Sequence, residues 1–254
     1  MTGMAATTRV ALITGAAGAI GSATARRLAQ DGFALALADL WPAGAGDDSQ
    51  LPAGLRLTLD VRSAEQVRAA VDQTLAAHGR IDVLVNVAGI TSFGSAQQLI
   101  EAEWQQVLDI NLSGTFRCCQ AVMPAMKAQG YGRIVNLGSV LGKNGGNPRP
   151  WIDASEQQAA GNVAYGVSKA GVHAMTAYLA RELASAGITV NAVAPGPVAS
   201  RMTTHLSPTI RALIPLGRMG TPEDVAAAVA FLVSDAAGFI TGEVMDVNGG
   251  MWCD

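Results

Sequence analysis

Cysteine and histidine are scarce in this chain of 254 residues. The three cysteines, Cys118, Cys119 and Cys253, have neither the spacing of a metal site nor that of a disulfide framework. The three histidines are scattered along the sequence. We therefore expect no metal site, and we expect reduced thiols in a core or an interface, as in a cytoplasmic protein.

Excess charge and long hydrophobic runs are also missing. The 17 Lys and Arg residues against 20 Asp and Glu residues give a net charge of −3, and there is no basic block. The apolar stretches are broken by glycine or charge well short of a membrane span, and residues 1–9 lack the apolar core of a signal peptide. These absences predict a cytoplasmic protein with neither nucleic acid nor a membrane as its partner.

Hydrophobic residues, by contrast, make up half of the chain, and charged residues only 15%. Much of the chain must therefore be buried, either in a layered domain or at subunit interfaces. A chain of this length can form one sizeable core, and nothing in it requires two. We predict a single domain over residues 1–254.

Residues 10–21 are the stretch around which the sequence is organised. A short apolar run ends in Gly15, Gly18 and Gly21 and continues into an amphipathic segment, 22–31. This pattern predicts a buried parallel strand, a tight turn and a helix whose N-terminal N–H groups suit a pyrophosphate. The spacing is not the usual G-x-G-x-x-G, so a glycine-rich turn without a ligand remains an alternative.

Asp39 indicates which dinucleotide that turn would bind. It follows the apolar run 33–38 and comes 18 residues after Gly21. A carboxylate at this place accepts hydrogen bonds from a ribose 2′-OH and repels a 2′-phosphate. Leu40 beside it offers no compensating cation, so the sequence favours NAD over NADP.

Strand and helix patterns alternate along the whole chain. The expected strands are 10–14, 33–38, 55–59, 81–85, 133–137, 188–194 and 244–247, and the expected helices are 22–31, 63–78, 103–129, 162–186 and 222–234. This order predicts an α/β fold with a doubly wound parallel sheet, the Rossmann fold. Polar or glycine residues end several strands, and we expect a ligand site at that edge: Asp39, Asp60, Asn86, Ser139 and Pro195-Gly196.

Tyr165 and Lys169 are spaced to share one face of a helix. A phenol is a poor acid or base at neutral pH, and a neighbouring cation lowers its pKa toward a useful value. The same spacing also occurs on ordinary helices, where the Lys points to water. The pair alone leaves both interpretations open.

Taken together, the motifs resemble the short-chain dehydrogenase/reductase family from about residue 9 to residue 250. The residues that carry the resemblance are Thr14-Gly15-x-x-x-Ala19-x-Gly21, Asn86-x-Ala88-Gly89, Asn111, Ser139, Tyr165-x-x-x-Lys169 and Pro195-Gly196. The resemblance implies that Tyr165 is the general acid or base and that Ser139 holds the substrate oxygen. It also implies that Lys169 binds the nicotinamide ribose and lowers the pKa of Tyr165, while Asn111 holds a water of a proton relay.

The resemblance also implies a set of cofactor-binding residues. They are Gly15, Gly18, Ala19, Ile20, Gly21, Asp39, Leu40, Asp60, Val61, Asn86, Ala88, Gly89, Tyr165, Lys169, Pro195, Gly196, Val198 and Ser200. Asp60 and Val61 would flank the adenine, and Val198 and Ser200 would meet the carboxamide. Ala19 stands where glycine is common in the family, Val87 replaces an asparagine, and Gly18 stands where NADP-dependent members often have arginine.

Two segments are candidates for substrate recognition. Ser139 and Tyr165 are 26 residues apart, about twice the family's usual separation, so 142–161 is an insertion. It is either a specificity loop that includes Trp151 or a surface loop, which chains tolerate readily. Residues 200–215 resemble the family's substrate lid, in which Arg201, Met202 and His205 either touch substrate or face solvent.

These observations predict an NAD-dependent oxidoreductase that interconverts a secondary alcohol and a ketone. The expected substrate is small and polar: a polyol, a sugar or a hydroxy-acid derivative. One alternative is a 3-oxoacyl thioester reductase, an activity that more often goes with NADP. Another is a catalytically silent NAD-binding regulator, which the presence of Ser139, Tyr165 and Lys169 disfavours. The resemblance further implies a homotetramer in which 103–129 and 162–186 pair with their own copies.

Overall fold

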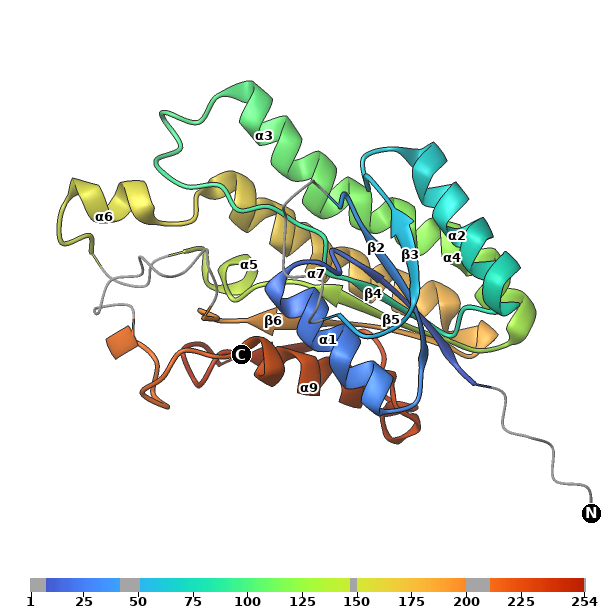
Figure 1. Cartoon of the computed structure of the whole chain (residues 1–254). Coiled ribbons are helices and arrows are strands. Elements are labelled where there is room, and N and C mark those ends of the chain that lie inside the picture. Colours follow the sequence, from blue (N-terminus) through green and yellow to red (C-terminus); the bar gives the residue numbers. More distant parts are fainter. Residues whose placement is uncertain (1–7, 42–50, 147–149, 200–210, 254) are drawn as a thin grey trace, which may run out of the picture.

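Seven parallel strands form one sheet at the centre of the protein (Figure 1). The computed structural model describes residues 8–41, 51–146, 150–199 and 211–253. The strands lie in the order β3-β2-β1-β4-β5-β6-β7. Their bounds are β1 Val10–Thr14, β2 Ala34–Asp39, β3 Leu55–Thr58, β4 Val83–Asn86, β5 Gly132–Leu137, β6 Ile188–Pro195 and β7 Val244–Val247. The order reverses between β1 and β4, where a doubly wound sheet binds its ligands.

Helices cover both faces of the sheet, which confirms the predicted Rossmann-type fold. On one face α1 (Ala19–Gln30) packs along α9 (Pro222–Val233). On the other lie α2 (Ala64–His78), α4 (Thr115–Gln129) and α7 (Val163–Leu183). The remaining helical elements are α3 (Glu101–Leu108), η2 (Asp109–Gly114), α5 (Leu141–Asn144), α6 (Ala154–Ala159), η3 (Ala184–Ala186) and η4 (Asp235–Ala237).

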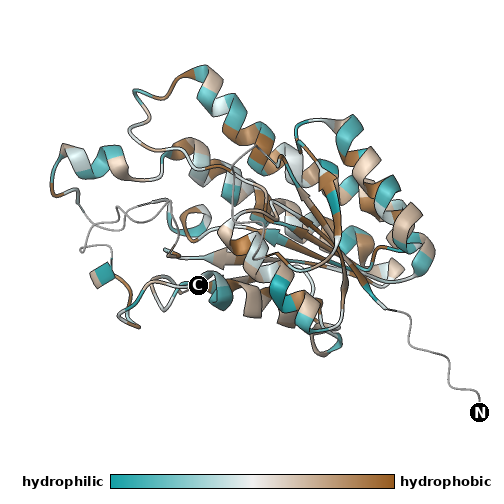
Figure 2. Cartoon of the chain, in the orientation of Figure 1, coloured by the Kyte–Doolittle hydropathy of each residue, from teal (hydrophilic) through white to brown (hydrophobic). Residues whose placement is uncertain are grey.

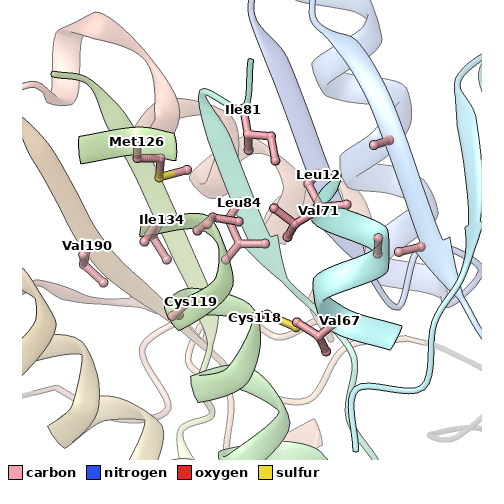
Figure 3. Packing of buried hydrophobic residues seen from close by; sticks show 14 of the residues in the cluster. Leu12, Val67, Val71, Ile81, Leu84, Cys118, Cys119, Met126, Ile134 and Val190 are labelled. Atoms are coloured by element: carbon pink, nitrogen blue, oxygen red, sulfur yellow. The ribbon is translucent and has the colours of Figure 1, made fainter. Parts of the chain in front are cut away.

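The core has two halves because successive side chains of a strand point to opposite faces of the sheet. Leu12, Leu84, Ile134 and Val190 belong to the cluster under α2, α4 and α7 (Figure 3). Their strand neighbours, such as Ile13 and Val85, join the cluster under α1 and α9. Figure 2 shows brown, hydrophobic strands between helices whose outer faces carry more teal. Strands buried on both faces explain the continuous apolar runs in the sequence.

Local capping signals explain where several helices begin and end. The Ser63 side chain accepts a hydrogen bond from Gln66 N, and α2 ends at Gly79, whose φ is 75°. Thr221 and Asp224 form a capping box at the start of α9.

Two expected segments differ in the structure. The expected helix 103–129 is α3, a π-helical turn (η2) and α4 in succession. The insertion 142–161 is not a loop throughout, because it holds the end of α5 and the whole of α6. Asp153 starts α6 by accepting hydrogen bonds from Ser155 N and Glu156 N. Across the described ranges, no helix is both long and apolar enough to cross a bilayer.

Candidate active site

The β1–α1 turn brings a helix end against the tips of two strands. Gly15 has φ 66°, and a Cβ on it would come within 2.6 Å of Ala88 N. A Cβ on Gly21 would come within 2.0 Å of Gly15 O. Thr14 Oγ1 accepts hydrogen bonds from Val87 N and Ala88 N, at 3.2 and 3.3 Å. Glycine at 15 and 21 is therefore required by close packing between the turn and the end of β4.

The start of α1 is suited to an anion. Gly18 is its extended N-cap residue, no described side chain caps this end, and the first turn holds no acidic residue. The N–H groups of Ala19 and Ile20 precede the helical hydrogen-bond ladder, so the positive helix end faces outward without a capping oxygen. This arrangement fits a dinucleotide pyrophosphate.

Asp39 is held beside the same turn. Its Oδ2 accepts a hydrogen bond from Ala17 N at 2.9 Å, and its Oδ1 accepts one from Leu40 N at 2.7 Å. The Leu40 side chain that follows is exposed. The carboxylate therefore stands at the end of β2 within the first turn's hydrogen-bond network, where a ribose would lie.

The predicted adenine-flanking residues have other partners in the structure. The Asp60 carboxylate pairs with the Arg62 guanidinium, with a shortest contact of 2.6 Å, and this pairing holds the pKa of Asp60 below its usual range. Val61 is buried, and a Cβ on Gly114 would come within 2.7 Å of its Cγ2. Their contact with an adenine stays a prediction.

Tyr165 and Lys169 lie on one face of α7, near the end of β5. Asn162 starts the helix by accepting hydrogen bonds from Ala164 N and Tyr165 N. Lys169 Nζ lies 5.7 Å from the centroid of the Tyr165 ring and donates a hydrogen bond to Leu137 O at 2.8 Å. Lys169 is buried, and burial lowers its pKa to about 8.

Ser139 joins this pair from the segment that follows β5. Its side chain is hydrogen-bonded to Tyr165, and this bond lowers the phenol pKa. Burial has the larger effect, however, and the pKa of Tyr165 is raised above its ordinary value. Lys169 Nζ lies over the ring and donates to a backbone carbonyl, and the expectation that Lys169 lowers this pKa stays a prediction.

Asn111 is buried in η2, next to Lys169. Its Oδ1 accepts a hydrogen bond from Ile90 N at 2.8 Å, and its Nδ2 donates to Ile90 O at 2.9 Å and to Ser168 Oγ at 3.0 Å. A Cβ on Gly89 would lie 3.2 Å from Asn111 Oδ1 and 3.6 Å from Lys169 Nζ. Three separate segments of the chain therefore bring Gly89, Asn111 and Lys169 close together. The water relay through Asn111 stays a prediction.

Other predicted cofactor residues hold the strand ends together. Asn86 Nδ2 donates to Asn136 Oδ1 at 2.9 Å, across β4 and β5. Pro195 O accepts from Val140 N at 3.0 Å, and Gly196 N donates to Val247 O at 3.1 Å. These contacts align the carboxyl ends of β4, β5, β6 and β7 at the edge that carries Ser139.

Comparison with known proteins gives matches over nearly the whole chain. A family model described as enoyl-(acyl carrier protein) reductase matches residues 15–252. The 3-oxoacyl-[acyl-carrier-protein] reductase of Staphylococcus aureus is 40% identical over 258 residues, covering 96% of this chain and 98% of that protein. The enzyme of the same name from Thermotoga maritima is 39% identical over 252 residues, covering 96% and 97%. The chain belongs to the short-chain dehydrogenase/reductase family.

A solved structure agrees with this assignment. The crystal structure of gox2181 superposes with a TM-score of 0.84 at 35% identity, covering 96% of this chain and 95% of that one. The short-chain dehydrogenase/reductase family is a family of nicotinamide-dependent oxidoreductases. The exposed helix end of α1 and the pair of half-buried Tyr165 and buried Lys169 are what such an enzyme needs.

Within this short-chain dehydrogenase, the insertion docks beside the active site. Gly94 N donates to Ala160 O at 3.0 Å, Phe93 forms a β-bridge with Gly161, and Gln158 Nε2 donates to Gln98 Oε1 at 2.8 Å. A Cβ on Gly161 would lie 3.8 Å from the Tyr165 ring. The insertion therefore ends against α7, the helix that carries Tyr165 and Lys169.

The predicted substrate residues are not all described. Trp151 is partly exposed, and its contact with substrate stays a prediction. Ser200, Arg201, Met202 and His205, with most of the predicted lid 200–215, lie outside the described residues.

Sequence reasoning missed two residues beside the catalytic cluster. Ser168 Oγ accepts from Asn111 Nδ2, and His173 Nε2 accepts from Ser139 N at 3.3 Å. The signal for His173 was its spacing, because it continues the four-residue step from Tyr165 to Lys169. No group of three or more His, Cys, Asp or Glu among the described residues could hold a metal ion.

Proposed function

We propose that this enzyme interconverts a 3-oxoacyl thioester and the corresponding 3-hydroxyacyl thioester, using NAD(H). The cluster of Ser139, Tyr165 and Lys169 carries the proposal, because it places two hydroxyl groups and a buried cation together at the edge of the sheet. The substrate class is supported by the names of relatives that are 39–40% identical over nearly the whole chain. We therefore prefer this substrate class to the small polar alcohol. The reaction type is the same as the one expected from the sequence, because a 3-oxo group is a ketone.

The chain's own residues supply placement and proton transfer. A bound nicotinamide supplies or accepts the hydride. Ser139 Oγ and the Tyr165 hydroxyl hydrogen-bond the substrate oxygen, and Tyr165 gives its proton to that oxygen as negative charge develops there during reduction. Because burial raises the pKa of Tyr165, the phenol stays protonated at neutral pH, the form that reduction requires. Lys169 is buried beside the ring, with Nζ 5.7 Å from its centroid.

The cofactor preference in this proposal depends on Asp39. Its carboxylate, held by Ala17 N and Leu40 N, would accept hydrogen bonds from a ribose diol. The same charge would repel a 2′-phosphate. We therefore include NADH rather than NADPH in the proposed function.

Steady-state assays with several substrates test the proposed function. NADH oxidation would be followed with a 3-oxoacyl thioester of coenzyme A, with polar ketones such as keto sugars, and with NADPH in parallel. The proposal expects the thioester with NADH to give the highest kcat/KM. A higher kcat/KM with a polar ketone would restore the small polar substrate. Tight NADH binding with no turnover of any substrate would indicate the regulatory alternative.

We also propose that the enzyme assembles as a homotetramer through its long helices. Phe116 of α4 and Tyr178 of α7 are exposed on the helices expected to pair, and Phe239 near the end of α9 is fully exposed. Large apolar side chains gathered on helix surfaces favour subunit contacts.

A further inference from the structure

His173 contacts the backbone of the serine that reaches Tyr165. It lies on α7 one turn beyond Lys169, so Tyr165, Lys169 and His173 follow one another at four-residue steps along one face. Its Nε2 accepts a hydrogen bond from Ser139 N at 3.3 Å. The Ser139 side chain is hydrogen-bonded in turn to Tyr165. The imidazole is therefore connected to the catalytic phenol through a single residue.

Two glycines make room for the imidazole. A Cβ on Gly138 would come within 2.1 Å of His173 Nε2, and a Cβ on Gly142 would come within 2.9 Å of His173 Cε1. Neither glycine has a positive φ that would by itself require glycine. The missing side chain at 138 is thus explained by the approach of the ring to the backbone around Ser139. At 142 the α7 backbone contributes as well, because a Cβ there would come within 2.7 Å of Ala170 N.

The segment around Ser139 has other anchors besides His173. Ser139 O accepts a hydrogen bond from Gly142 N at 3.0 Å, and Ser139 Oγ accepts one from Leu141 N at 3.2 Å. Gly138 N donates to Val193 O at 2.8 Å, and Val140 N donates to Pro195 O at 3.0 Å, which fixes the residues on either side to β6. Ser139 N, between them, points instead to α7 and His173. Among the described residues, Ser139 N has no hydrogen bond to a neighbouring strand, and the imidazole of His173 is the acceptor for this N–H.

We propose that His173 is a positioning residue: its Nε2 holds the Ser139 N–H, and this contact places the Ser139 hydroxyl against Tyr165. The inference rests on the proposed roles of Ser139 and Tyr165. A backbone N–H can only donate, so Nε2 must be unprotonated and the ring proton must lie on Nδ1. A second proton would turn Nε2 into a donor facing a donor, and the contact would break.

The titratable groups around His173 come from several elements. Lys169 and Tyr165 lie on its own helix, and Lys143 of α5 pairs with Asp246 of β7 at 3.0 Å. Gly138, directly after β5, and Val193 of β6 lie near the ring and carry no charge. Because several groups titrate here, the pH dependence of activity alone would not identify His173. The test must also follow Ser139 directly.

Two substitutions of His173 separate positioning from packing. In His173→Gln, the amide oxygen can accept the Ser139 N–H at the place of Nε2 and does not titrate. His173→Leu fills the space without an acceptor. His78→Gln, in α2, is the matched control, since it removes a histidine away from this site. For each variant, kcat and KM would be measured from about pH 5.5 to 8.5, the range in which imidazole ordinarily titrates.

We expect His173→Leu to lower kcat about tenfold with little change in KM, the effect of losing one hydrogen bond that aligns a catalytic group. We expect His173→Gln to keep most of the activity and to lose the fall in kcat at acid pH. His78→Gln should match the wild type throughout. Unchanged kcat in the Leu variant, or an acid fall in the Gln variant equal to that of the wild type, would overturn the proposal.

The amide signal of Ser139 tests the contact without any substrate. In ¹⁵N-labelled protein we expect its chemical shift to follow an imidazole titration in the wild type and to be flat in His173→Gln. If this shift titrates while the thioester is not turned over, the positioning role stands and the proposed substrate fails. If the Ser139 amide shift is the same in the wild type and in His173→Leu, the positioning role is wrong whatever the substrate. If His173→Leu does not fold, the same comparison with His173→Gln decides the matter.

Discussion

Burial sets the protonation of both catalytic side chains. The ammonium of Lys169 is taken out of water beside Leu137 O, and its pKa falls to about 8, while the same burial raises the pKa of Tyr165. At neutral pH the pair is therefore a neutral phenol next to a mainly protonated amine rather than a phenolate–ammonium pair. This state suits proton donation to a ketone and requires a higher pH for the reverse reaction.

The buried Lys169 predicts a pH-dependent stability. Its pKa is about 8 in the folded protein and 10.5 by the reference value, so between these pH values the unfolded chain binds more protons. Wild-type stability should rise relative to Lys169→Met as pH increases from 8 to 10.5, by on the order of 3 kcal/mol. Urea unfolding at several pH values measures this rise. Lys127→Met, on the surface of α4, is the control, and equal pH slopes in wild type and Lys169→Met would contradict the account.

Cofactor choice is also decided by single residues. Replacing Asp39 by Ala and Leu40 by Arg removes the repelling carboxylate and adds a phosphate partner at the end of β2. The ratio of kcat/KM with NADPH to that with NADH should increase at least tenfold, roughly the effect of one charge-assisted contact. Leu40→Ala alone should leave the preference for NADH unchanged. Equal efficiency with both cofactors in the wild type would remove the role given to Asp39.

Among the elements, those with local signals were predictable from the sequence. The helix α2 begins after Ser63 and ends at Gly79, as these residue types indicated. The capping box at Thr221 likewise marks the start of α9. The π-helical turn at Asp109–Gly114 was not predictable, because it depends on distant contacts. There Asn111 reaches the backbone of Ile90, and Gly114 lies against Val61. Helical turns of this kind are often found at functional sites.

The capping box of α9 gives a prediction about stability. Thr221 Oγ1 accepts a hydrogen bond from Asp224 N, and the Asp224 carboxylate accepts one from Thr221 N. Thr221→Ala should cost about 1 kcal/mol of unfolding free energy. Calorimetry should show a Tm lower by about 2–4 °C. Thr221→Ser keeps the cap and should behave as the wild type, whereas equal loss in both variants would mean that the cap is not the cause.

For the whole molecule, the sheet order explains how distant residues become one site. Strand ends at Asp39, Asn86, Leu137 and Pro195 share one edge because all seven strands run parallel. The order of elements in the sequence was enough to predict this edge, whereas the meeting of Ser139 with Tyr165 was implied by the family resemblance. It could not predict that Lys169 would donate to Leu137 O, since that contact depends on how α7 packs on β5.

Close contacts between helix and backbone were beyond sequence reasoning as well. The approach of His173 to Ser139 requires the absence of a side chain at Gly138, and Gly142 lets the α7 backbone come close to the same segment. Neither glycine lies in a recognised motif. For the substrate class, the names of the relatives favour the thioester that was expected from the sequence only as an alternative. The insertion was interpreted either as a specificity loop or as a surface loop, and sequence reasoning did not predict that its end packs through backbone contacts on Phe93 and Gly94.

The proposed homotetramer predicts the mass of the enzyme in solution. Light scattering after size-exclusion chromatography should give four times the mass of one chain. Tyr178→Asp puts a charge on the exposed face of α7 and should shift the distribution toward smaller species. Arg68→Asp, on α2, serves as a control outside the helices expected to pair. A mass of one or two chains for the wild type would contradict the tetramer.

Tyr165→Phe tests the central claim most directly, because it removes only the hydroxyl that is hydrogen-bonded to Ser139. NADH binding would be measured by fluorescence titration, and thioester reduction by NADH absorbance, on the same preparation. The account predicts that NADH binding stays within about threefold of the wild type while kcat falls by about 10²–10⁴, the usual contribution of a general acid. A variant that binds NADH and reduces the thioester at the wild-type rate would contradict it.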